Sequence, residues 1–281
     1  MSLFADDTCL LLSDKNLGSL QHLCNMELIQ INNWFLANKL TANLSKASKY
    51  MITLGKSRTH PPDNFNIVMG NTTLEKVTSI KYLGVIFDVN FNWHDHITYV
   101  CTKISRSVGV LSKLRYYVNI KTLLKVYYSL VSSHLCYALT AWGRAGVTAL
   151  HPLKVLQNRA IRFISRAPRF RRLDNDYINL RLLKFDDMHK HAVSKFMHQY
   201  YHGKLPDYFS NFFGTTQPNH EYNLRCNANE NFRPVDCRKA SMERSIRYIG
   251  PKLWENIPMD IKTASVHKFK KDYKNFLLAK Y

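Results

Sequence analysis

The sequence lacks acidic side chains over a long central stretch. Between His96 and Leu173 there is no Asp or Glu, while 14 Lys or Arg fall in the same interval. A solvated helical face normally mixes both signs through pairs three or four residues apart. A stretch with one sign of charge therefore favours binding to a polyanion. A basic surface kept only for solubility is the alternative.

The positive charge is unevenly distributed. The 281 residues carry 40 Lys and Arg against 20 Asp and Glu, a formal net charge of +20. Residues 1–88 hold 8 basic and 7 acidic side chains, whereas residues 89–281 hold 32 and 13. We therefore expect a nearly neutral N-terminal part followed by a strongly basic one.

Long hydrophobic runs are also absent. No run of about eighteen uncharged apolar residues occurs, so no membrane span or membrane partner is expected. The N-terminus has no basic region before an apolar core, which argues against a secretory signal. These features predict an intracellular protein of the nucleus or cytoplasm.

Several motifs of known chemistry are missing. The six cysteines form no Cys-x-x-Cys pair, so a zinc finger is not supported. We find no Ser-His-Asp arrangement, glycine-rich phosphate loop or dinucleotide fingerprint. His198 and His202 have a spacing that suits zinc, but no carboxylate or cysteine is placed with them. A structural histidine cluster is the favoured interpretation.

One acidic pair stands between two apolar runs at the N-terminus. Asp6 and Asp7 follow Leu3-Phe4-Ala5 and precede Cys9-Leu10-Leu11-Leu12. This pattern predicts a β-hairpin over residues 2–12 with the acids at its tip. Two adjacent carboxylates repel each other, and divalent cations with a preference for oxygen ligands, such as Mg²⁺, remove that conflict. Two solvated acids in a turn are the alternative.

Short strands and one helix are expected next. Apolar residues at helical spacing predict an amphipathic helix over 17–35, with Ser13 or Asp14 as its cap. Residues 50–54 read as a strand, and Gly70-Asn71 as the turn of a hairpin between 67–69 and 72–74. Residues 80–87 read as one strand with Gly84 inside it.

Helices dominate after residue 93. An apolar stripe from Ile97 to Leu114 has basic residues on its opposite face. Residues 121–142 read as a second helix that is apolar nearly all round, with Tyr127 and Tyr128 in the core. A third helix covers about 150–165. Further helices are expected at 186–201, 239–247 and 265–278, with a loop over 211–231.

Four pieces of the chain occur in the order of a known family. They are Phe4-Ala5-Asp6-Asp7, then Asn43 with Lys46, then Tyr82-Leu83-Gly84, then the tail motif Gly250-Pro251-Lys252-Leu253-Trp254. Together they resemble the second half of a reverse transcriptase from a non-LTR retrotransposon of the Jockey-like LINE type. Phe-Ala-Asp-Asp is similar to the catalytic hairpin of the palm, usually Tyr-Ala-Asp-Asp. The likeness covers essentially the whole chain.

The resemblance implies roles for individual residues. Asp6 and Asp7 would bind catalytic Mg²⁺, and Lys46 would protonate the pyrophosphate leaving group. Tyr82, Leu83 and Gly84 would form the primer grip. A basic helical thumb would hold the duplex of RNA template and DNA primer through phosphate contacts. The candidate contacts are Lys103, Arg106, Lys113, Arg159, Arg162, Arg166, Arg169, Arg171 and Arg172.

We therefore expect an α+β fold. Residues 1–92 would be a palm remnant with the catalytic hairpin and primer grip, 93–172 a basic helical thumb, and 173–281 a helical C-terminal domain. Because Met1 stands three residues before Phe4, the fingers and the upstream palm aspartate are expected to be missing. The chain should then bind Mg²⁺ weakly and not polymerise alone. A non-catalytic module that binds RNA or RNA–DNA duplex is the rival hypothesis.

Overall fold

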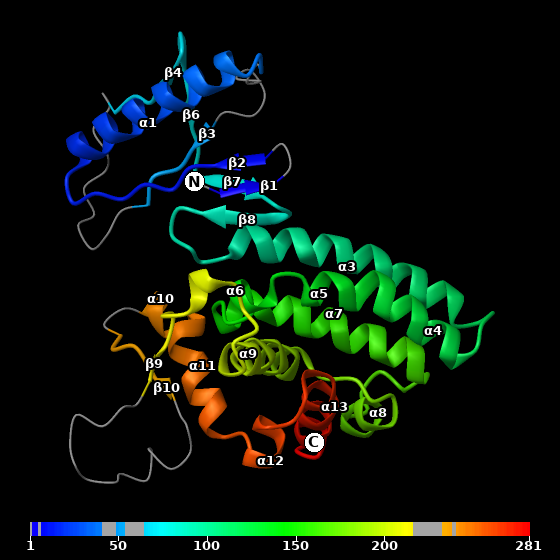
Figure 1. Ribbon diagram of the computed structural model, residues 1–281. Coiled ribbons are helices and arrows are strands. Elements are labelled where there is room, and N and C mark those ends of the chain that lie inside the picture. Colours follow the sequence, from blue (N-terminus) through cyan, green and yellow to red (C-terminus); the bar gives the residue numbers. More distant parts are fainter. Residues whose placement is uncertain (1, 5–6, 41–48, 54–64, 216–231, 238–239) are drawn as a thin grey trace, which may run out of the picture. The chain divides into compact units, whose positions relative to one another are not determined.

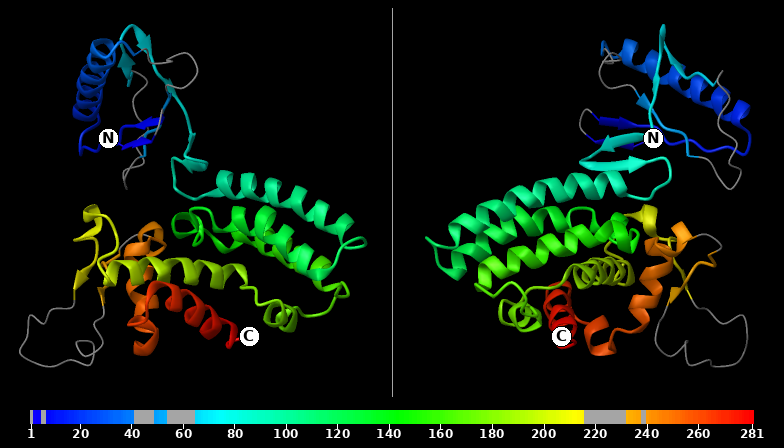
Figure 2. Two further views of the ribbon diagram at one scale, coloured as in Figure 1. Left: turned by 45° about the vertical axis from the view of Figure 1, so that its right-hand side comes forward. Right: turned by 180° about the vertical axis from the view of Figure 1, so that it is seen from behind.

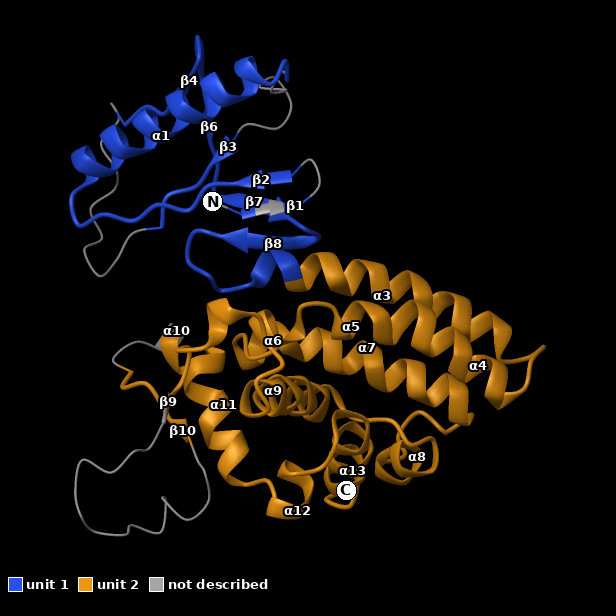
Figure 3. Ribbon diagram, in the orientation of Figure 1, with its two compact units in different colours: residues 1–96 blue, residues 97–281 orange. Residues whose placement is uncertain are grey.

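The computed structural model describes residues 2–4, 7–40, 49–53, 65–215, 232–237 and 240–281. The chain divides into two compact units, residues 1–96 and residues 97–281 (Figure 3). Most described residues are helical, and the strands pair into small two-stranded sheets (Figure 1). The predicted α+β class is confirmed.

Unit 1 consists of short antiparallel hairpins, one parallel strand pair and a long helix. The helix is α1 (Leu17–Ala37). The antiparallel pairs are β1 (Ser2–Phe4) with β2 (Asp7–Cys9), β4 (Val68–Met69) with β5 (Thr72–Thr73), and β7 (Ser79–Tyr82) with β8 (Val85–Asp88). The parallel pair joins β3 (Lys49–Tyr50) to β6 (Glu75–Lys76). The predicted hairpins at residues 2–12 and around Gly70-Asn71 are confirmed.

The sequence pattern predicted one strand over residues 80–87, and this prediction is wrong. These residues form the β7–β8 hairpin, in which Tyr82 pairs with Val85 and Leu83-Gly84 is the two-residue turn. Both turn residues have positive φ, 45° at Leu83 and 79° at Gly84. Two-residue hairpin turns of type I′ need positive φ at both positions, because only then does the turn match the twist of the strands. Gly84 therefore belongs to a turn rather than to the interior of a strand.

The helix α1 packs against β4. Gln21 Nε2 donates to the carbonyl of Asn66 at 3.0 Å, and Asn25 Oδ1 accepts from the backbone of Val68 at 3.0 Å. Asn16, rather than the expected Ser13 or Asp14, caps the helix by accepting from the Gly18 N–H at 2.8 Å. None of the residues of α1 is fully buried.

Unit 2 is helical over most of its described length. The helix α3 (His94–Leu114) begins in unit 1 and continues into unit 2. It is followed by α4 (Ile120–Tyr127), the π-helical turn η1 (Tyr128–Ser132), α5 (Ser133–Cys136), α6 (Leu139–Trp142), α7 (Val147–Ser165), α8 (Asp174–Asn179) and α9 (Phe185–Tyr201). The views of Figure 2 show α3, α4 and α7 side by side.

The C-terminal part packs on α9 through two of its helices. It contains the short turn η2 (Asp207–Phe209), the strand pair β9 (Gly214–Thr215) and β10 (Phe232–Arg233), and the helices α10 (Ala240–Glu243), α11 (Ile246–Glu255), α12 (Met259–Lys262) and α13 (Val266–Leu278). Both α11 and α13 pack on α9. The expected loop at 211–231 thus includes β9, and residues 216–231 lie outside the described residues. The expected helix at 239–247 is divided between α10 and α11.

The predicted helix over 121–142 is interrupted. The backbone of Tyr137 is extended, and Ala138 adopts the left-handed conformation with φ 48° before α6 begins. Trp142 Nε1 donates to the Tyr137 carbonyl at 2.8 Å, and this bond holds the break. Tyr127 is in the core as expected, but Tyr128 is 48% exposed, so its predicted burial is wrong.

The core of unit 2 joins α3, α4, α7 and α9. Ile104, Leu111, Leu123 and Ile161 are fully buried. Gln157 is the polar residue at the centre of this core, and its Nε2 donates to the Tyr127 hydroxyl at 3.1 Å and the Leu183 carbonyl at 3.0 Å. Burial with satisfied hydrogen bonds fixes the register of α7 against its neighbours.

Three histidines in α9 and at its C-cap have structural partners. Nε2 of His191, His198 and His202 lies within 3.0, 2.8 and 3.1 Å of the carbonyls of Lys270, Ala264 and Lys262. Across the described ranges, no group of three His, Cys, Asp or Glu side chains could hold a metal ion. The favoured interpretation of a structural cluster is confirmed. Among the helices that the structure describes, none is long and apolar enough to span a membrane.

Candidate nucleic-acid interface

The predicted catalytic hairpin is present in unit 1. Phe4 pairs with Asp7 across β1 and β2, so both residues lie at the same end of this strand pair. Asp7 opens β2, and its side chain is exposed. Asp6 lies outside the described residues, as do Asn43 and Lys46 of the next predicted motif. The structure therefore places Asp7 at the end of a hairpin and leaves the roles of Asp6 and Lys46 as predictions.

The hairpin with Asp7 and the hairpin with the predicted primer grip contact each other. The Tyr82 hydroxyl donates to Ser2 Oγ at 3.3 Å, which joins β7 to β1. Figures 1 and 2 show the two hairpins next to one another within unit 1. The structure thus brings Tyr82, 80 residues away in sequence, to the strand that leads to the acidic pair.

Asp88 organises the connection from β8 to α3. It is 7% exposed, and its carboxylate accepts from the backbone N–H groups of Asn90, Asn92 and Trp93 at 3.0, 3.1 and 2.8 Å. Phe91 and Trp93 have positive φ in this loop, and both rings contact Phe87. The carboxylate therefore offsets the cost of a strained loop next to the β7–β8 hairpin.

His96 supports the same hairpin from the first turn of α3. Its Nδ1 accepts from the Ile86 N–H at 3.3 Å. The side chain is 2% exposed, and burial lowers the pKa of His96. A neutral imidazole is the form that can accept this hydrogen bond.

The fit of the described residues to magnesium is incomplete. Carboxylate oxygens are the ligands that Mg²⁺ prefers, and Asp7 supplies one exposed carboxylate. Two-metal catalysis needs carboxylates from more than one strand, and the described residues offer no cluster of three candidate ligands.

The predicted phosphate contacts on α3 face solvent to different degrees. Arg106 and Lys113 are exposed. Lys103 is half-buried, and its Nζ lies 5.5 Å from the ring centre of Tyr99. All three side chains carry the positive charge that an anionic partner needs. Arg106 and Lys113 are also exposed, so a phosphate could reach them.

The three arginines of α7 differ in their surroundings. Arg159 is exposed, with its guanidinium 5.8 Å from the ring centre of Phe163. Arg162 Nη2 reaches the carbonyl of Arg171 at 3.5 Å, and Arg166 Nη2 donates to the carbonyl of Arg115 at 3.1 Å. Arg166 is also the left-handed C-cap of α7, with φ 55°. Arg162 and Arg166 thus tie loops together, whereas Arg159 is freer to bind a phosphate.

The loop after α7 carries the remaining predicted contacts. Arg169, Arg171 and Arg172 are all exposed. Arg171 Nη2 binds both oxygens of the buried Asp176 at 2.6 and 2.8 Å. This ion pair anchors the loop to α8, so Arg169 and Arg172 are the better placed candidates for an external anion.

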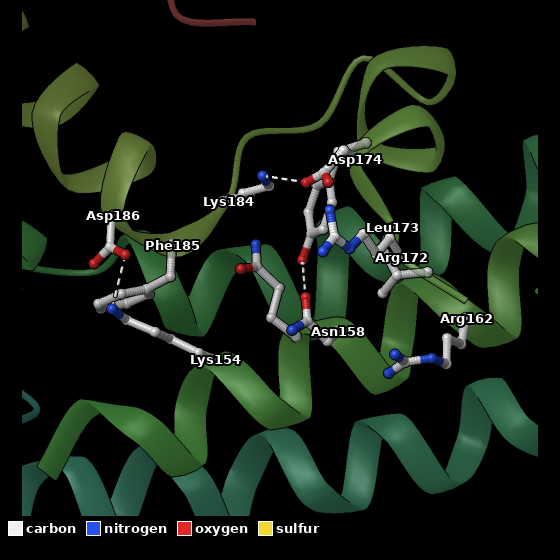
Figure 4. Close-up of a pocket in the computed structure, with 11 residues that line it drawn as sticks. Lys154, Asn158, Arg162, Arg172, Leu173, Asp174, Lys184, Phe185 and Asp186 are labelled. Carbon is white, nitrogen blue, oxygen red and sulfur yellow. Dashed lines mark hydrogen bonds and ion pairs between the residues drawn. The ribbon is translucent and has the colours of Figure 1, made fainter. Parts of the chain in front are cut away.

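A cavity of about 420 Å³ lies between α7, α8 and the start of α9 (Figure 4). Two ion pairs line it: Lys154 Nζ lies 2.7 Å from Asp186, and Lys184 Nζ lies 2.5 Å from Asp174. The hydrogen bond from Lys184 lowers the pKa of Asp174. The cavity is also lined by Arg162 and Arg172. Its cations exceed its acids, so it favours anionic groups.

Sequence reasoning missed two residues that organise loops of the two units, Asp88 in unit 1 and Arg115 in unit 2. Arg115 was not selected, although its guanidinium lies over the rings of Tyr116 and Phe163 at 4.6 and 5.1 Å. Asp88 was not selected either. The sequence offered one indication of its role, because an Asp side chain commonly accepts a hydrogen bond from the backbone N–H of the residue two positions later, here Asn90.

The chain is similar in sequence to RNA-directed DNA polymerases of mobile elements. It is 24% identical over 196 residues to the "Probable RNA-directed DNA polymerase from transposon X-element" of Drosophila melanogaster, which covers 68% of this chain and 21% of that protein. It is 28% identical over 134 residues to the "RNA-directed DNA polymerase from mobile element jockey" of Drosophila funebris, or 46% of this chain and 14% of that protein. The jockey polymerase of Drosophila melanogaster is 23% identical over 198 residues, or 69% of this chain and 21% of that protein.

The predicted resemblance to Jockey-like reverse transcriptases is confirmed by these relatives. The chain spans about a fifth or less of the length of the curated relatives that it matches. No protein-family model matches it, and no solved structure matches it.

Proposed function

We propose that this chain is a segment of a reverse transcriptase of a mobile element, in which unit 1 carries part of the palm. The observation that carries the proposal is the similarity to polymerases named for jockey and the X-element. The β1–β2 hairpin would be the catalytic hairpin, and the Leu83-Gly84 turn of β7–β8 the primer grip. The hydrogen bond from Tyr82 to Ser2 supports a joint role, because it links the two hairpins.

Unit 1 would position the end of a primer. A turn with two positive φ values presents its backbone with little side-chain bulk at Gly84, which suits close approach of a nucleic-acid backbone. Asp6 and Asp7 would hold Mg²⁺, which supplies charge neutralisation for nucleotidyl transfer when bound. Lys46 would act as a cation near the leaving pyrophosphate.

The basic helices of unit 2 would act as the thumb. Their candidate contacts on α3 and α7 fall in the acid-free stretch between His96 and Leu173. Phosphate contacts of this kind position a duplex and are indifferent to its sequence. An A-form RNA–DNA hybrid presents a wide, shallow minor groove that basic helices can follow. The partner would therefore be the duplex of RNA template and DNA primer.

A salt titration of binding tests the thumb assignment. The substrate is a blunt RNA–DNA hybrid, and the variant replaces Arg106, Lys113 and Arg159 with Gln. These side chains are exposed, and they are preferred to Arg162 and Arg166, which bind carbonyl groups. Each lost phosphate contact should reduce the slope of log K against log salt by about one unit.

A second triple variant is the matched control. Lys268, Lys270 and Lys271 on α13 are also exposed, and their replacement by Gln removes the same charge. The slope should fall by about three units for the first variant and much less for the second. Equal effects of the two variants would show that net charge alone drives binding.

Primer extension tests the catalytic part. We expect no template-dependent incorporation on a poly-rA/oligo-dT substrate with Mg²⁺ or Mn²⁺, because two-metal catalysis needs carboxylates from more than one strand, whereas the proposed ligands Asp6 and Asp7 are adjacent residues of one hairpin. Incorporation that is lost in Asp7→Ala would show instead that this chain is active alone.

A further inference from the structure

Two loops of unit 2 meet at the same end of its helices. One loop, residues 115–119, joins α3 to α4, and the other, residues 166–173, joins α7 to α8. Arg166 Nη2 donates to the carbonyl of Arg115 at 3.1 Å, which ties the loops together. Figure 1 shows the ends of α3 and α7 on the same side of unit 2.

These loops expose three large aromatic side chains. Tyr116 is 71% exposed, Tyr117 is 85% exposed and Phe170 is 91% exposed. Single exposed apolar residues are ordinary on protein surfaces. Here three exposed rings lie on two loops that a hydrogen bond joins, and such a concentration of exposed aromatic side chains needs an explanation.

Arginines accompany the rings. The guanidinium of Arg115 lies 4.6 Å from the ring centre of Tyr116, and that of Arg169 lies 5.7 Å from the ring centre of Phe170. Within the described ranges, the ion pairs include no partner for Arg115, Arg166, Arg169 or Arg172. Arg171 differs, because its pair with Asp176 fixes the second loop to α8. Arg172 also lies close enough to Asp174 to lower the pKa of that carboxyl group. The rings therefore lie beside a net excess of positive charge.

We propose that this aromatic–arginine patch, formed by Arg115, Tyr116, Tyr117, Arg169, Phe170 and Arg172, binds unpaired nucleotides. Exposed bases would stack on the rings of Tyr117 and Phe170, and phosphates would bind Arg169 and Arg172. A base inside a duplex already stacks on its neighbours, so exposed rings discriminate for single strands. The planar guanidinium suits phosphate contacts better than an ammonium group does.

The inference rests on the proposed function for the identity of the polyanion. It adds that unpaired nucleotides next to a duplex bind at a site of their own. This site is distinct from the phosphate contacts of Arg106, Lys113 and Arg159. A reverse transcriptase handles both forms, since its template is unpaired ahead of synthesis and paired behind it.

The test compares Tyr117→Ala/Phe170→Ala with the unchanged chain. Both side chains are so exposed that their removal should not disturb the fold. The probes are a fluorescent oligo-uridylate of about 15 nucleotides and a blunt RNA–DNA hybrid, each measured by anisotropy. Loss of stacking should weaken oligo-uridylate binding by about 5- to 150-fold per base. Affinity for the hybrid and the salt slope should change little.

Tyr208→Ala is the matched control. Tyr208 is 87% exposed and lies in η2, away from the two loops in sequence. Its removal should leave oligo-uridylate binding unchanged. Arg169→Gln/Arg172→Gln should instead lower the salt slope for oligo-uridylate by about two units.

Three outcomes would overturn the inference. Unchanged oligo-uridylate affinity in the double aromatic variant would show that the rings do not stack on bases. An equal loss for hybrid and oligo-uridylate would show that the patch belongs to the duplex site. Loss of binding to phosphatidylserine vesicles with oligo-uridylate binding intact would identify a membrane surface. If the unchanged chain binds neither nucleic acid, the proposed function itself fails.

Discussion

Gly143 lies directly against His189. A Cβ added at Gly143 would come within 2.5 Å of His189 Cδ2 and 2.6 Å of the Leu139 carbonyl oxygen. Contacts this short force a backbone or ring to move. Gly143 therefore sets the distance between the end of α6 and the helix α9, on which α11 and α13 also pack.

Gly143→Ala should destabilise unit 2. Because one clashing atom belongs to the backbone, relaxation is limited, and we expect a loss of about 2–3 kcal/mol, as for overpacked cores. Gly109→Ala is the matched control, since Gly109 lies inside α3 with nothing within 4 Å of the added Cβ. That change should stabilise the chain by about 0.5–1 kcal/mol. Chemical denaturation measures both, and a loss for both variants would contradict the packing argument.

Asp88→Ala should loosen the connection between β8 and α3. The substitution removes the acceptors of three backbone N–H groups, and a hydrogen bond to a charged group has a net contribution of about 1.5–3 kcal/mol to stability. Hydrogen exchange of the amides of residues 90–93 should accelerate strongly.

Two further variants calibrate the effect of Asp88. Asp88→Asn keeps one acceptor oxygen and should fall between the unchanged chain and Asp88→Ala. Asp95→Ala removes the same charge from the exposed first turn of α3 and should have a smaller effect, about 0.3–1 kcal/mol. Equal acceleration in Asp95→Ala and Asp88→Ala would show that charge, rather than the three hydrogen bonds, orders the loop.

Helix periodicity predicted much of unit 2. The stripe that includes Ile104 and Leu111 correctly predicted α3, because burial of one face follows the helical repeat. The break at Ala138 could not be predicted, since Ala is a strong helix former and the break depends on the contact between Trp142 and Tyr137. Tertiary contacts overrode local propensity there.

The candidate site was predictable in composition but not in detail. Arg159, Arg162 and Arg166 could be selected as candidate contacts because they lie in the stretch without acidic residues. Periodicity cannot show that Arg166 reaches a carbonyl of another helix end, because such partners come from residues distant in sequence. The same holds for Tyr82 and Ser2. The Leu83-Gly84 turn was missed because Leu is not a usual residue at positive φ.

Leu83→Asn should stabilise the β7–β8 hairpin. Leu83 has φ 45°, a conformation that costs most L-residues about 1–2 kcal/mol. Asn tolerates it, and Asn-Gly is the preferred type I′ pair, so stability should rise by about 1 kcal/mol. Leu83→Ala shortens the side chain without relieving the strain of the positive φ, so it should not stabilise the hairpin.

If Leu83→Asn and Leu83→Ala lose stability equally, the Leu83 side chain matters more than its backbone conformation. Loss of primer binding in a stabilised Leu83→Asn variant would assign Leu83 to the primer grip.

Stability should fall as the pH is lowered through the range in which His189 titrates. Burial, followed by the positive charge of Arg144, lowers the pKa of His189 to about 4, from about 6.5 for an exposed histidine. Between these values the unfolded chain gains a proton that the folded chain does not bind, so stability is full above about pH 6.5 and declines toward pH 4. This difference between the two pKa values corresponds to about 3 kcal/mol of stability.

His189→Leu, measured by denaturation across this pH range, should flatten the decline in stability, whereas His267→Gln on the exposed face of α13 should not. An unchanged decline in His189→Leu would assign the acid sensitivity to other groups, of which His191 and His198 also have pKa values lowered by burial.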